Sequence, residues 1–259
     1  LIAVLLVSLL SYSSGLLQND YFDLEEDRQK RPSRPLPGDK VKPRTVIIVA
    51  ALFVVAALIM AFLLGSATLV PAVALAITVT AYDYRGKRIP IIGPILMGLC
   101  RGLDLMLGAS LLGWAGLSAP AVVISALLVT AYIAFVTHIA AKETEGYRAG
   151  SLRWAPMLTL LAWFAALYLL ICPVTVYMLG VSIALTVAAV AWATYCGHLL
   201  RDDTPPAVIQ KTIGRFIRGL LLIQAALAAF AGWPGPIVVL LLLAAWPISQ
   251  RLNRWFYAS

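Results

Sequence analysis

Asn19, Asp23 and Asp27 are the residues whose types and spacing point most directly to chemistry. They place three oxygen-bearing side chains at intervals of four residues. On an α-helix a step of four turns the side chain by only about 40°, so the three would share one face. Mg²⁺ prefers hard oxygen ligands, and proteins often hold it through one or two carboxylates together with substrate phosphates. The spacing therefore predicts a site for Mg²⁺ and a phosphate-bearing substrate.

The composition indicates which fold must position these residues. Hydrophobic residues make up 61% of the chain, charged residues only 12%, and the mean hydropathy is +0.90. Apolar runs long enough to cross a bilayer recur along the whole chain, without the alternation typical of barrel strands. We therefore expect an all-α, polytopic helical membrane protein with about nine transmembrane helices. The expected spans are 1–18, 46–64, 68–82, 91–112, 119–141, 154–172, 174–197, 212–231 and 236–250.

The positions of the basic residues predict the topology. All Lys and Arg residues except Arg101 lie in or beside the segments 19–45, 83–90, 142–153 and 198–218 and in the C-terminal tail. The positive-inside rule places these segments in the cytoplasm, and we expect the membrane to be the bacterial inner (cell) membrane. The net charge of +8 then reflects topology and contact with anionic membrane lipids, and gives no reason to expect nucleic acid as a partner.

The Asn/Asp motif follows the first expected span directly, so the metal–phosphate site would lie at the membrane surface. This position indicates an enzyme that acts on a lipid diphosphate. The chain begins with Leu1 rather than Met, and no basic region precedes the first apolar run. We therefore expect a single domain over 1–259 that lacks at least one upstream helix.

Two cytoplasmic loops offer cations for a diphosphate, and a third offers more acids. Prolines after Arg31 end the first helix and reverse the chain, so Arg34 could fold back over the metal site. Lys87 and Arg88 could bind a diphosphate from the next charged loop, although cations in such loops are equally often topological anchors. Glu143 and Glu145 form a second acidic pair at the end of another span. They could bind metal or substrate, and the alternative is that they are simply solvated.

Arg101 and Asp104 lie three residues apart inside an apolar span, and hence on one helix face. A charge at the centre of a membrane helix costs about 2.5–3.5 kcal/mol on insertion scales, so these side chains should pair or face a polar cavity. We expect them to face a cavity and to contact substrate there. A purely structural ion pair is the alternative.

These residues carry a resemblance to a known family. The run Asn19…Asp23…Asp27, followed by Arg34-Pro35-Leu36, resembles the first signature of the UbiA superfamily of membrane prenyltransferases. Tyr84-x-x-Lys87-Arg88 resembles its basic loop, and Glu145-Gly146…Gly150 its second acidic motif. The stretch from Gly93 to Asp104 resembles most the EboC-type branch. The resemblance covers most of the chain in the expected order and implies a UbiA-type helical bundle.

The resemblance also implies a reaction, the transfer of a prenyl group from a prenyl diphosphate to a hydrophobic or aromatic acceptor. Loss of the diphosphate leaves a cation-like allylic carbon that electrostatics can stabilise. The roles divide as follows: Asn19, Asp23, Asp27 and Glu143 would hold Mg²⁺; Asp23, Asp27, Lys87 and Glu143 would be catalytic; and Arg34, Tyr84, Lys87, Arg88, Arg101, Asp104 and Glu145 would bind substrate.

One departure from the family pattern bears on activity. The second motif commonly has Asp at both ends of a five-residue window, whereas here the window runs from Glu143 to Tyr147 and lacks one ligand. A non-catalytic carrier of isoprenoids or polyprenol phosphates is therefore the main alternative. A generic solute transporter comes third. A CDP-alcohol phosphotransferase ranks low because its D-G-x-x-A-R run is absent.

Overall fold

The structure is a computed structural model of the 259-residue chain, and it describes all residues except 142–149, 172–175, 202–203, 233–234 and 257–259. The described residues form helices joined by short connections and contain no strand. They fall into two compact units, Leu1–Thr130 and Ala131–Ser259. The predicted single domain over 1–259 stays a prediction.

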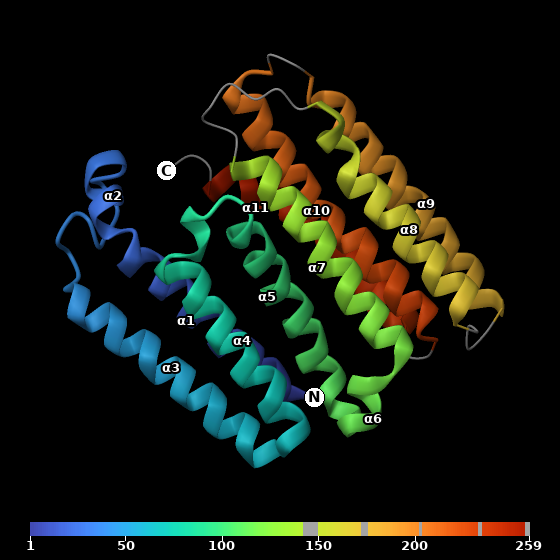
Figure 1. Ribbon diagram of the computed structural model, residues 1–259, viewed down its shortest axis with the longest axis horizontal. Coiled ribbons are helices and arrows are strands. Elements are labelled where there is room, and N and C mark those ends of the chain that lie inside the picture. Colours follow the sequence, from blue (N-terminus) through green and yellow to red (C-terminus); the bar gives the residue numbers. More distant parts are fainter. Residues whose placement is uncertain (142–149, 172–175, 202–203, 233–234, 257–259) are drawn as a thin grey trace. The chain divides into compact units, whose positions relative to one another are not determined.

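The main helices of the first unit are long and apolar, and α2, which follows the first of them, is short and charged (Figure 1). Three short helices connect the longer ones: η1, which carries basic residues between α4 and α5, and η2 and α6 between α5 and α7. The elements are α1 (Ile2–Phe22), α2 (Leu24–Lys30), α3 (Pro43–Leu64), α4 (Ser66–Tyr84), η1 (Gly86–Arg88), α5 (Ile92–Ala109), η2 (Ser110–Leu112), α6 (Gly113–Ser118) and α7 (Pro120–Ala141), whose last part belongs to the second unit.

Small residues hold the helices of the first unit close together. α1 packs along α3 and α4, and α4 packs along α5. Ala57, Ala61 and Ala72 lie in the core between these helices, where short side chains let the backbones approach each other. Ser14 of α1 donates a hydrogen bond to the carbonyl oxygen of Ala50 in α3 over 2.9 Å. This packing fixes α1, whose C-terminal end carries the Asn/Asp motif.

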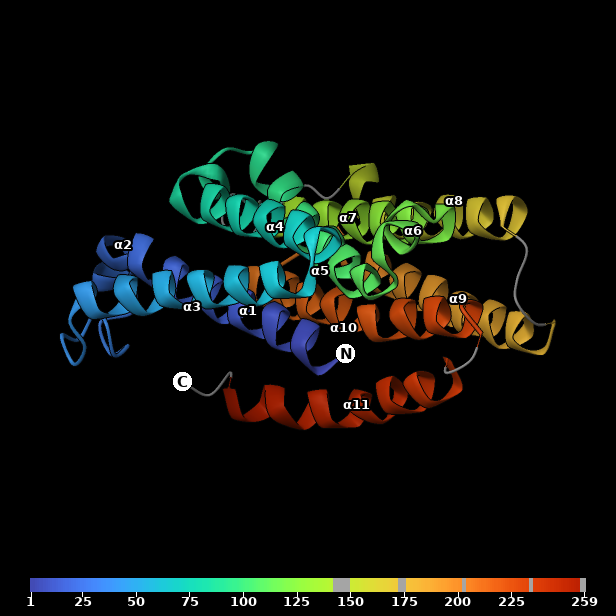
Figure 2. The same cartoon turned by 90° about the horizontal axis from the view of Figure 1, so that it is seen from below.

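The second unit is built around α10, which packs against both α9 and α11, while α8 packs along α9 (Figure 2). Several of its buried hydroxyl groups form hydrogen bonds inside the unit, as hydrocarbon surroundings favour. Tyr132 donates to the carbonyl oxygen of Phe216 over 2.9 Å, and Ser182 donates to that of Ala226 over 2.7 Å. The elements are η3 (Gly150–Trp154), α8 (Ala155–Leu170), α9 (Val176–Leu199), α10 (Pro206–Phe230) and α11 (Gly235–Phe256).

The described helices confirm the prediction of a polytopic all-α membrane protein. Among the described residues, eight helical stretches are long and apolar enough to cross a bilayer, and Gly235–Ser249 of α11 is a shorter apolar helix. The connection expected near 113–118 is itself helical, as α6. It extends the fourth candidate span to Ser118.

Candidate active site

The Asn/Asp motif lies where α1 bends into α2. Helical hydrogen bonds continue through the bend, because the Asp23 amide donates to the Asn19 carbonyl oxygen over 3.0 Å and the Asp27 amide to that of Asp23 over 2.8 Å. Asp23 itself, with φ −95° and ψ 3°, leaves helical geometry and separates the two helices. The motif therefore keeps its spacing of one turn per acidic residue, but not on a straight helix.

Lys87 joins the first two members of the motif from a different part of the chain. Its Nζ atom donates to Oδ1 of Asn19 over 2.9 Å and lies 2.7 Å from Oδ1 of Asp23. The side chains of Lys87 and Asp23 are 14% and 21% exposed, so this ion pair is largely withdrawn from solvent. A short, charge-assisted contact of this kind is stronger than one between neutral groups.

Close backbone packing around η1 holds Lys87 in place. A Cβ atom at Gly86 would lie 2.8 Å from the carbonyl oxygen of Ala81, and one at Gly93 would lie 2.9 Å from the carbonyl oxygen of Gly86. Only glycine fits these positions without movement of the backbone. The turn from α4 into α5 is therefore tight enough to direct Lys87 towards the end of α1.

Arg34 forms an ion pair with Asp27, the third member of the motif. The loop after α2 returns as predicted, and Nη1 of Arg34 lies 2.9 Å from Oδ2 of Asp27 and 3.7 Å from Oδ1 of Asp20. Asp27 is buried, and with Leu36 it lines a cavity of about 380 Å³ under the returning loop. The motif is thus shared between two cations, Lys87 at Asn19 and Asp23, and Arg34 at Asp27.

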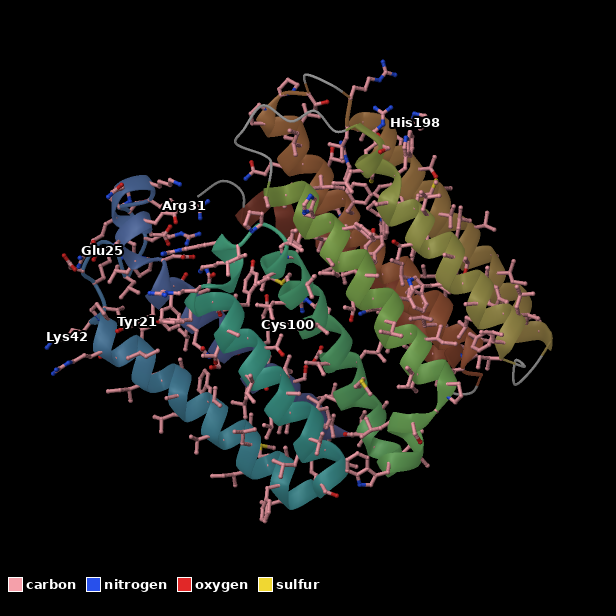
Figure 3. The ribbon with its side chains drawn as sticks, viewed as in Figure 1. Tyr21, Glu25, Arg31, Lys42, Cys100 and His198 are labelled. Atoms are coloured by element: carbon pink, nitrogen blue, oxygen red, sulfur yellow. The ribbon has the colours of Figure 1, made fainter. Side chains whose placement is uncertain are left out.

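Glu25 and Glu26 of α2 have partners of their own. Glu25 pairs with Arg28, and Glu26 pairs with Lys30 over 2.7 Å. The hydrogen bond from Lys30 holds the pKa of Glu26 below its usual value. Charged side chains gather around α2 in Figure 3, where Glu25 and Arg31 are labelled.

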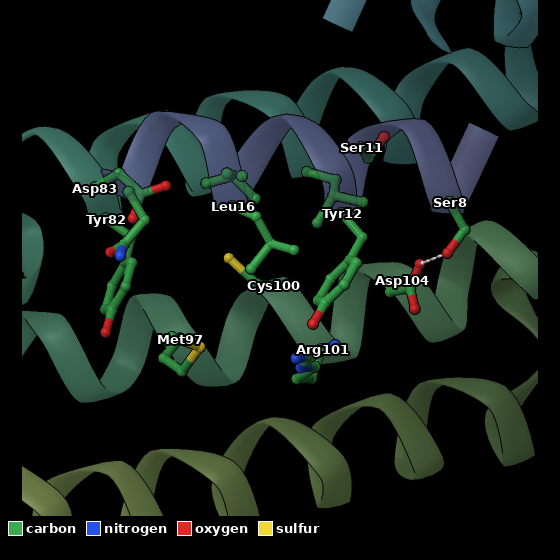
Figure 4. A pocket seen from close by; sticks show the side chains of 14 residues that line it. Ser8, Ser11, Tyr12, Leu16, Tyr82, Asp83, Met97, Cys100, Arg101 and Asp104 are labelled. Carbon is green, nitrogen blue, oxygen red and sulfur yellow. Dashed lines mark hydrogen bonds between the residues drawn. The ribbon is translucent and has the colours of Figure 1, made fainter. Parts of the chain in front are cut away.

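A second cavity, of about 330 Å³, opens beside α1 and is bounded by α4 and α5 (Figure 4). One end carries Asn19 and Asp83, and the other carries Ser8 and Asp104. The wall between them is mainly apolar and includes Leu16, Leu75, Val79 and Met97. We call this space the α1 cavity. It can hold a long apolar molecule with a polar group at the Asn19 end.

Arg101 and Asp104 both line the α1 cavity, as expected from their spacing. They are not paired with each other in the described part of the chain. Ser8 donates a hydrogen bond to Oδ1 of Asp104 over 2.6 Å, and the Cζ atom of Arg101 lies 5.6 Å from the centre of the Tyr12 ring. Each charge thus has one partner on α1 and remains available to a molecule in the cavity.

The remaining predicted site residues are not gathered into the α1 cavity. Tyr84 is exposed, and its ring packs edge-on against Phe22 with 5.5 Å between the centres. This contact links the end of α4 to the end of α1. Arg88 is exposed on η1. Glu143 and Glu145 lie outside the described residues, so their position is not part of this geometry.

A model of the UbiA prenyltransferase family matches residues 1–220. The chain belongs to this family. It is 29% identical over 157 residues to digeranylgeranylglyceryl phosphate synthase of Methanosarcina mazei, which covers 61% of the chain and 53% of that protein. It is 32% identical over 145 residues to the Thermococcus gammatolerans enzyme of the same name, which covers 56% of the chain and 50% of that protein.

The chain spans about half the length of the curated relatives that it matches. No solved structure matches it significantly. The predicted membership of the UbiA superfamily is confirmed, and the resemblance to the EboC-type branch stays a prediction. Prenyltransferases of the UbiA family generally depend on a divalent metal, so the question is whether the side-chain oxygens of this site suit Mg²⁺.

The donors at the Asn19 end suit that ion. They are an amide oxygen and carboxylates, which are ligands that Mg²⁺ accepts. The Lys87 ammonium already takes the place of a cation between Asn19 and Asp23. Among the described residues, no three Asp, Glu, His or Cys side chains form a metal cluster by themselves. A bound metal would therefore also depend on phosphate oxygens, as Mg²⁺ sites commonly do.

Asp83 is an acidic residue beside these donors that the sequence patterns did not predict as part of the site. It lies in the last turn of α4, is only 3% exposed, and lines the α1 cavity at the Asn19 end. Its position directly after the expected span 68–82 and close to Lys87 in the chain was an available signal. Asp83 stands between two tyrosines and next to a basic run, so the segment reads as a source of cations rather than of a carboxylate.

Proposed function

We propose that this UbiA family member transfers a prenyl group from a prenyl diphosphate to an acceptor within the membrane, with Mg²⁺ as cofactor. The observation that carries the proposal is the contact of Lys87 with both Asn19 and Asp23 at one end of the α1 cavity. A cation and metal-binding oxygens meet there beside an apolar space. This combination suits a molecule with a diphosphate head and a hydrocarbon tail.

In the proposed reaction Asn19, Asp23, Asp27 and Glu143 would hold the metal, which would supply positive charge to the diphosphate. Lys87 exchanges its carboxylate partner for a diphosphate oxygen, and Arg34 and Arg88 add positive charge nearby. The bond between the first prenyl carbon and the diphosphate oxygen breaks, and its electron pair leaves with the diphosphate. Fixed positive charge favours this step because it is already in place when the negative charge develops.

The acceptor then forms a bond to that carbon and loses a proton. An electron-rich aromatic acceptor is the first expectation. The names of the archaeal relatives point instead to glyceryl phosphate that carries geranylgeranyl groups, so an alcohol acceptor of that class belongs beside it. Tyr84 and Glu145 are assigned to substrate binding. We place the charged loops in the cytoplasm, at the surface of the cell membrane.

The test measures diphosphate release by the purified full-length protein that contains this chain. Prenyl diphosphates of several lengths are supplied with Mg²⁺, with and without aromatic and glyceryl phosphate acceptors. We expect release that requires an acceptor and is lost in Asp23→Asn. Glu25→Gln removes the same charge from the exposed side of α2 and should retain release, since the Glu25 side chain is 84% exposed and pairs with Arg28.

Two other outcomes would count against transfer. Mg²⁺-dependent binding of the prenyl diphosphate without release, under all acceptors, would favour the carrier that is our alternative. Equal release by the wild type and Asp23→Asn would remove the acidic motif from the reaction and contradict the proposed site.

A further inference from the structure

We propose that Asp83 is an additional ligand of the metal in this site, supplied by α4 opposite the donors of α1. This inference rests on the proposed function, because it names a further residue of the same metal–diphosphate site. The second acidic motif of this chain has Tyr147 where the family commonly has Asp, and Asp83 adds a carboxylate from another helix.

Burial and orientation single out Asp83. The residue is 3% exposed, and its side chain lines the α1 cavity together with Asn19. Figure 4 shows Asp83 at the end of the cavity away from Ser8 and Asp104. Within the described part of the chain, no ion pair or hydrogen bond to its carboxyl group is found. A buried charged group without a partner is costly, and proteins keep such groups paired or bound to a metal. The carboxyl group of Asp83 is therefore placed for a ligand.

The charges around Lys87 point to a divalent cation as the ligand of Asp83. Lys87 supplies one positive charge, which already pairs with Asp23 and contacts Asn19. With the carboxyl groups of Asp23 and Asp83 both ionised, this one ammonium group would leave one negative charge uncompensated. A divalent cation in place of the ammonium would balance both carboxylates. It would also release Lys87 to contact the diphosphate.

The helix geometry supports this exchange. Asn19 and Asp23 lie on successive turns at the end of α1, whereas Asp83 comes from the last turn of α4, and α1 and α4 pack against each other. Donors from two helices surround a cation more completely than donors from one. Mg²⁺ requires nearly octahedral coordination, so donors from two directions leave the remaining positions to phosphate oxygens and water.

The test measures binding of Mn²⁺, as a paramagnetic probe, to the full-length protein in detergent with and without inorganic diphosphate. Bound Mn²⁺ loses its free-ion resonance signal, so affinity is read without turnover. We expect Asp83→Asn to weaken Mn²⁺ binding in the presence of diphosphate by at least about tenfold. Glu25→Gln, which removes a solvent-exposed acid, should leave it unchanged. Asp83→Glu should retain more affinity than Asp83→Asn.

Thermal unfolding without metal separates a ligand from a structural residue. Asp83→Asn keeps the shape of the side chain and removes an unpartnered buried charge, so we expect unchanged or higher stability. A variant that unfolds earlier but binds Mn²⁺ like the wild type would overturn the assignment. So would wild-type affinity in a stable variant. If the wild type itself shows no diphosphate-dependent Mn²⁺ binding, the proposed function fails together with this assignment.

Discussion

The Nζ atom of Lys87 lies 2.7 Å from Oδ1 of Asp23, so a residue of the α4–α5 turn neutralises a residue at the end of α1. Lys87→Gln keeps a hydrogen-bond donor and removes the charge. Hydrogen bonds to charged groups contribute about 1.5–3 kcal/mol, so we expect kcat/KM for the prenyl diphosphate to fall about 10- to 100-fold. Steady-state assays of diphosphate release measure this change.

Lys30→Gln is the matched control for Lys87→Gln. Lys30 is exposed and pairs with Glu26 on the outer side of α2, so its loss should leave kcat/KM within about twofold. Equal losses in both variants would show that only the overall charge of the loops matters. That result would contradict a specific role for Lys87.

Gly86 tests whether the position of Lys87 depends on close backbone packing. Gly86→Ala brings a Cβ atom to 2.8 Å from the carbonyl oxygen of Ala81, so the turn must move. We expect a loss of about 1–3 kcal/mol in stability, typical of overpacking, and lower turnover because Lys87 moves with the turn. Gly108→Ala has no atom within 4 Å of the new Cβ and should be neutral or slightly stabilising. Thermal melts and release assays of both variants provide the comparison.

Arg34 and Asp27 allow loop closure to be separated from chemistry. Their ion pair is partly exposed at Arg34 and therefore contributes no more than about 1 kcal/mol to stability. It nevertheless ties α2 to the returning loop, in which Leu36 is buried. Arg34→Gln should make that loop a few times more sensitive to thermolysin. The exchange Asp27→Arg with Arg34→Asp should restore resistance to thermolysin but not diphosphate release. Recovery of release in the exchanged protein would exclude Asp27 as a metal ligand.

The Asp104 carboxylate should lower the stability of the protein and raise its turnover. A charge at the centre of a membrane helix costs about 2.5–3.5 kcal/mol on insertion scales, so Asp104→Leu should melt at a higher temperature. If the carboxylate binds substrate in the α1 cavity, turnover should fall at least about tenfold. Ser8→Ala removes only the hydrogen bond to Asp104 and should have a smaller effect on turnover. Unchanged turnover in Asp104→Leu would leave Asp104 a purely structural role.

Hydropathy and charge predicted much of the helical framework. The expected span 68–82 corresponds to Ser66–Tyr84, and 236–250 lies within Gly235–Phe256. These assignments succeed because a helix pairs its polar backbone N–H and C=O groups internally, which a bilayer requires, while its apolar side chains face the lipid. The helix at Gly113–Ser118 was missed because a helix of this length is shorter than any hydropathy window.

The site was predicted less completely. Spacing predicted that Asn19, Asp23 and Asp27 share one helix face, but that argument assumes a straight helix. The bend at Asp23 assigns these side chains to two different cations instead. The meeting of Lys87 with Asn19 depends on how α1 and α4 pack, and a single sequence does not contain that contact.

The polar groups at the two ends of the α1 cavity would also limit the length of a bound hydrocarbon tail. Asn19 and Ser8 line opposite ends and lie eleven residues apart on α1, which corresponds to about 16 Å along a helix. A hydrocarbon tail of that length, anchored by its diphosphate near Asn19, would end against Asp104, where it would strip water from a charge. Longer tails must leave the cavity sideways before that point. Chain-length selectivity would then be set by the electrostatic cost of reaching a carboxylate, and a neutral side chain at position 104 would extend the range of accepted tails.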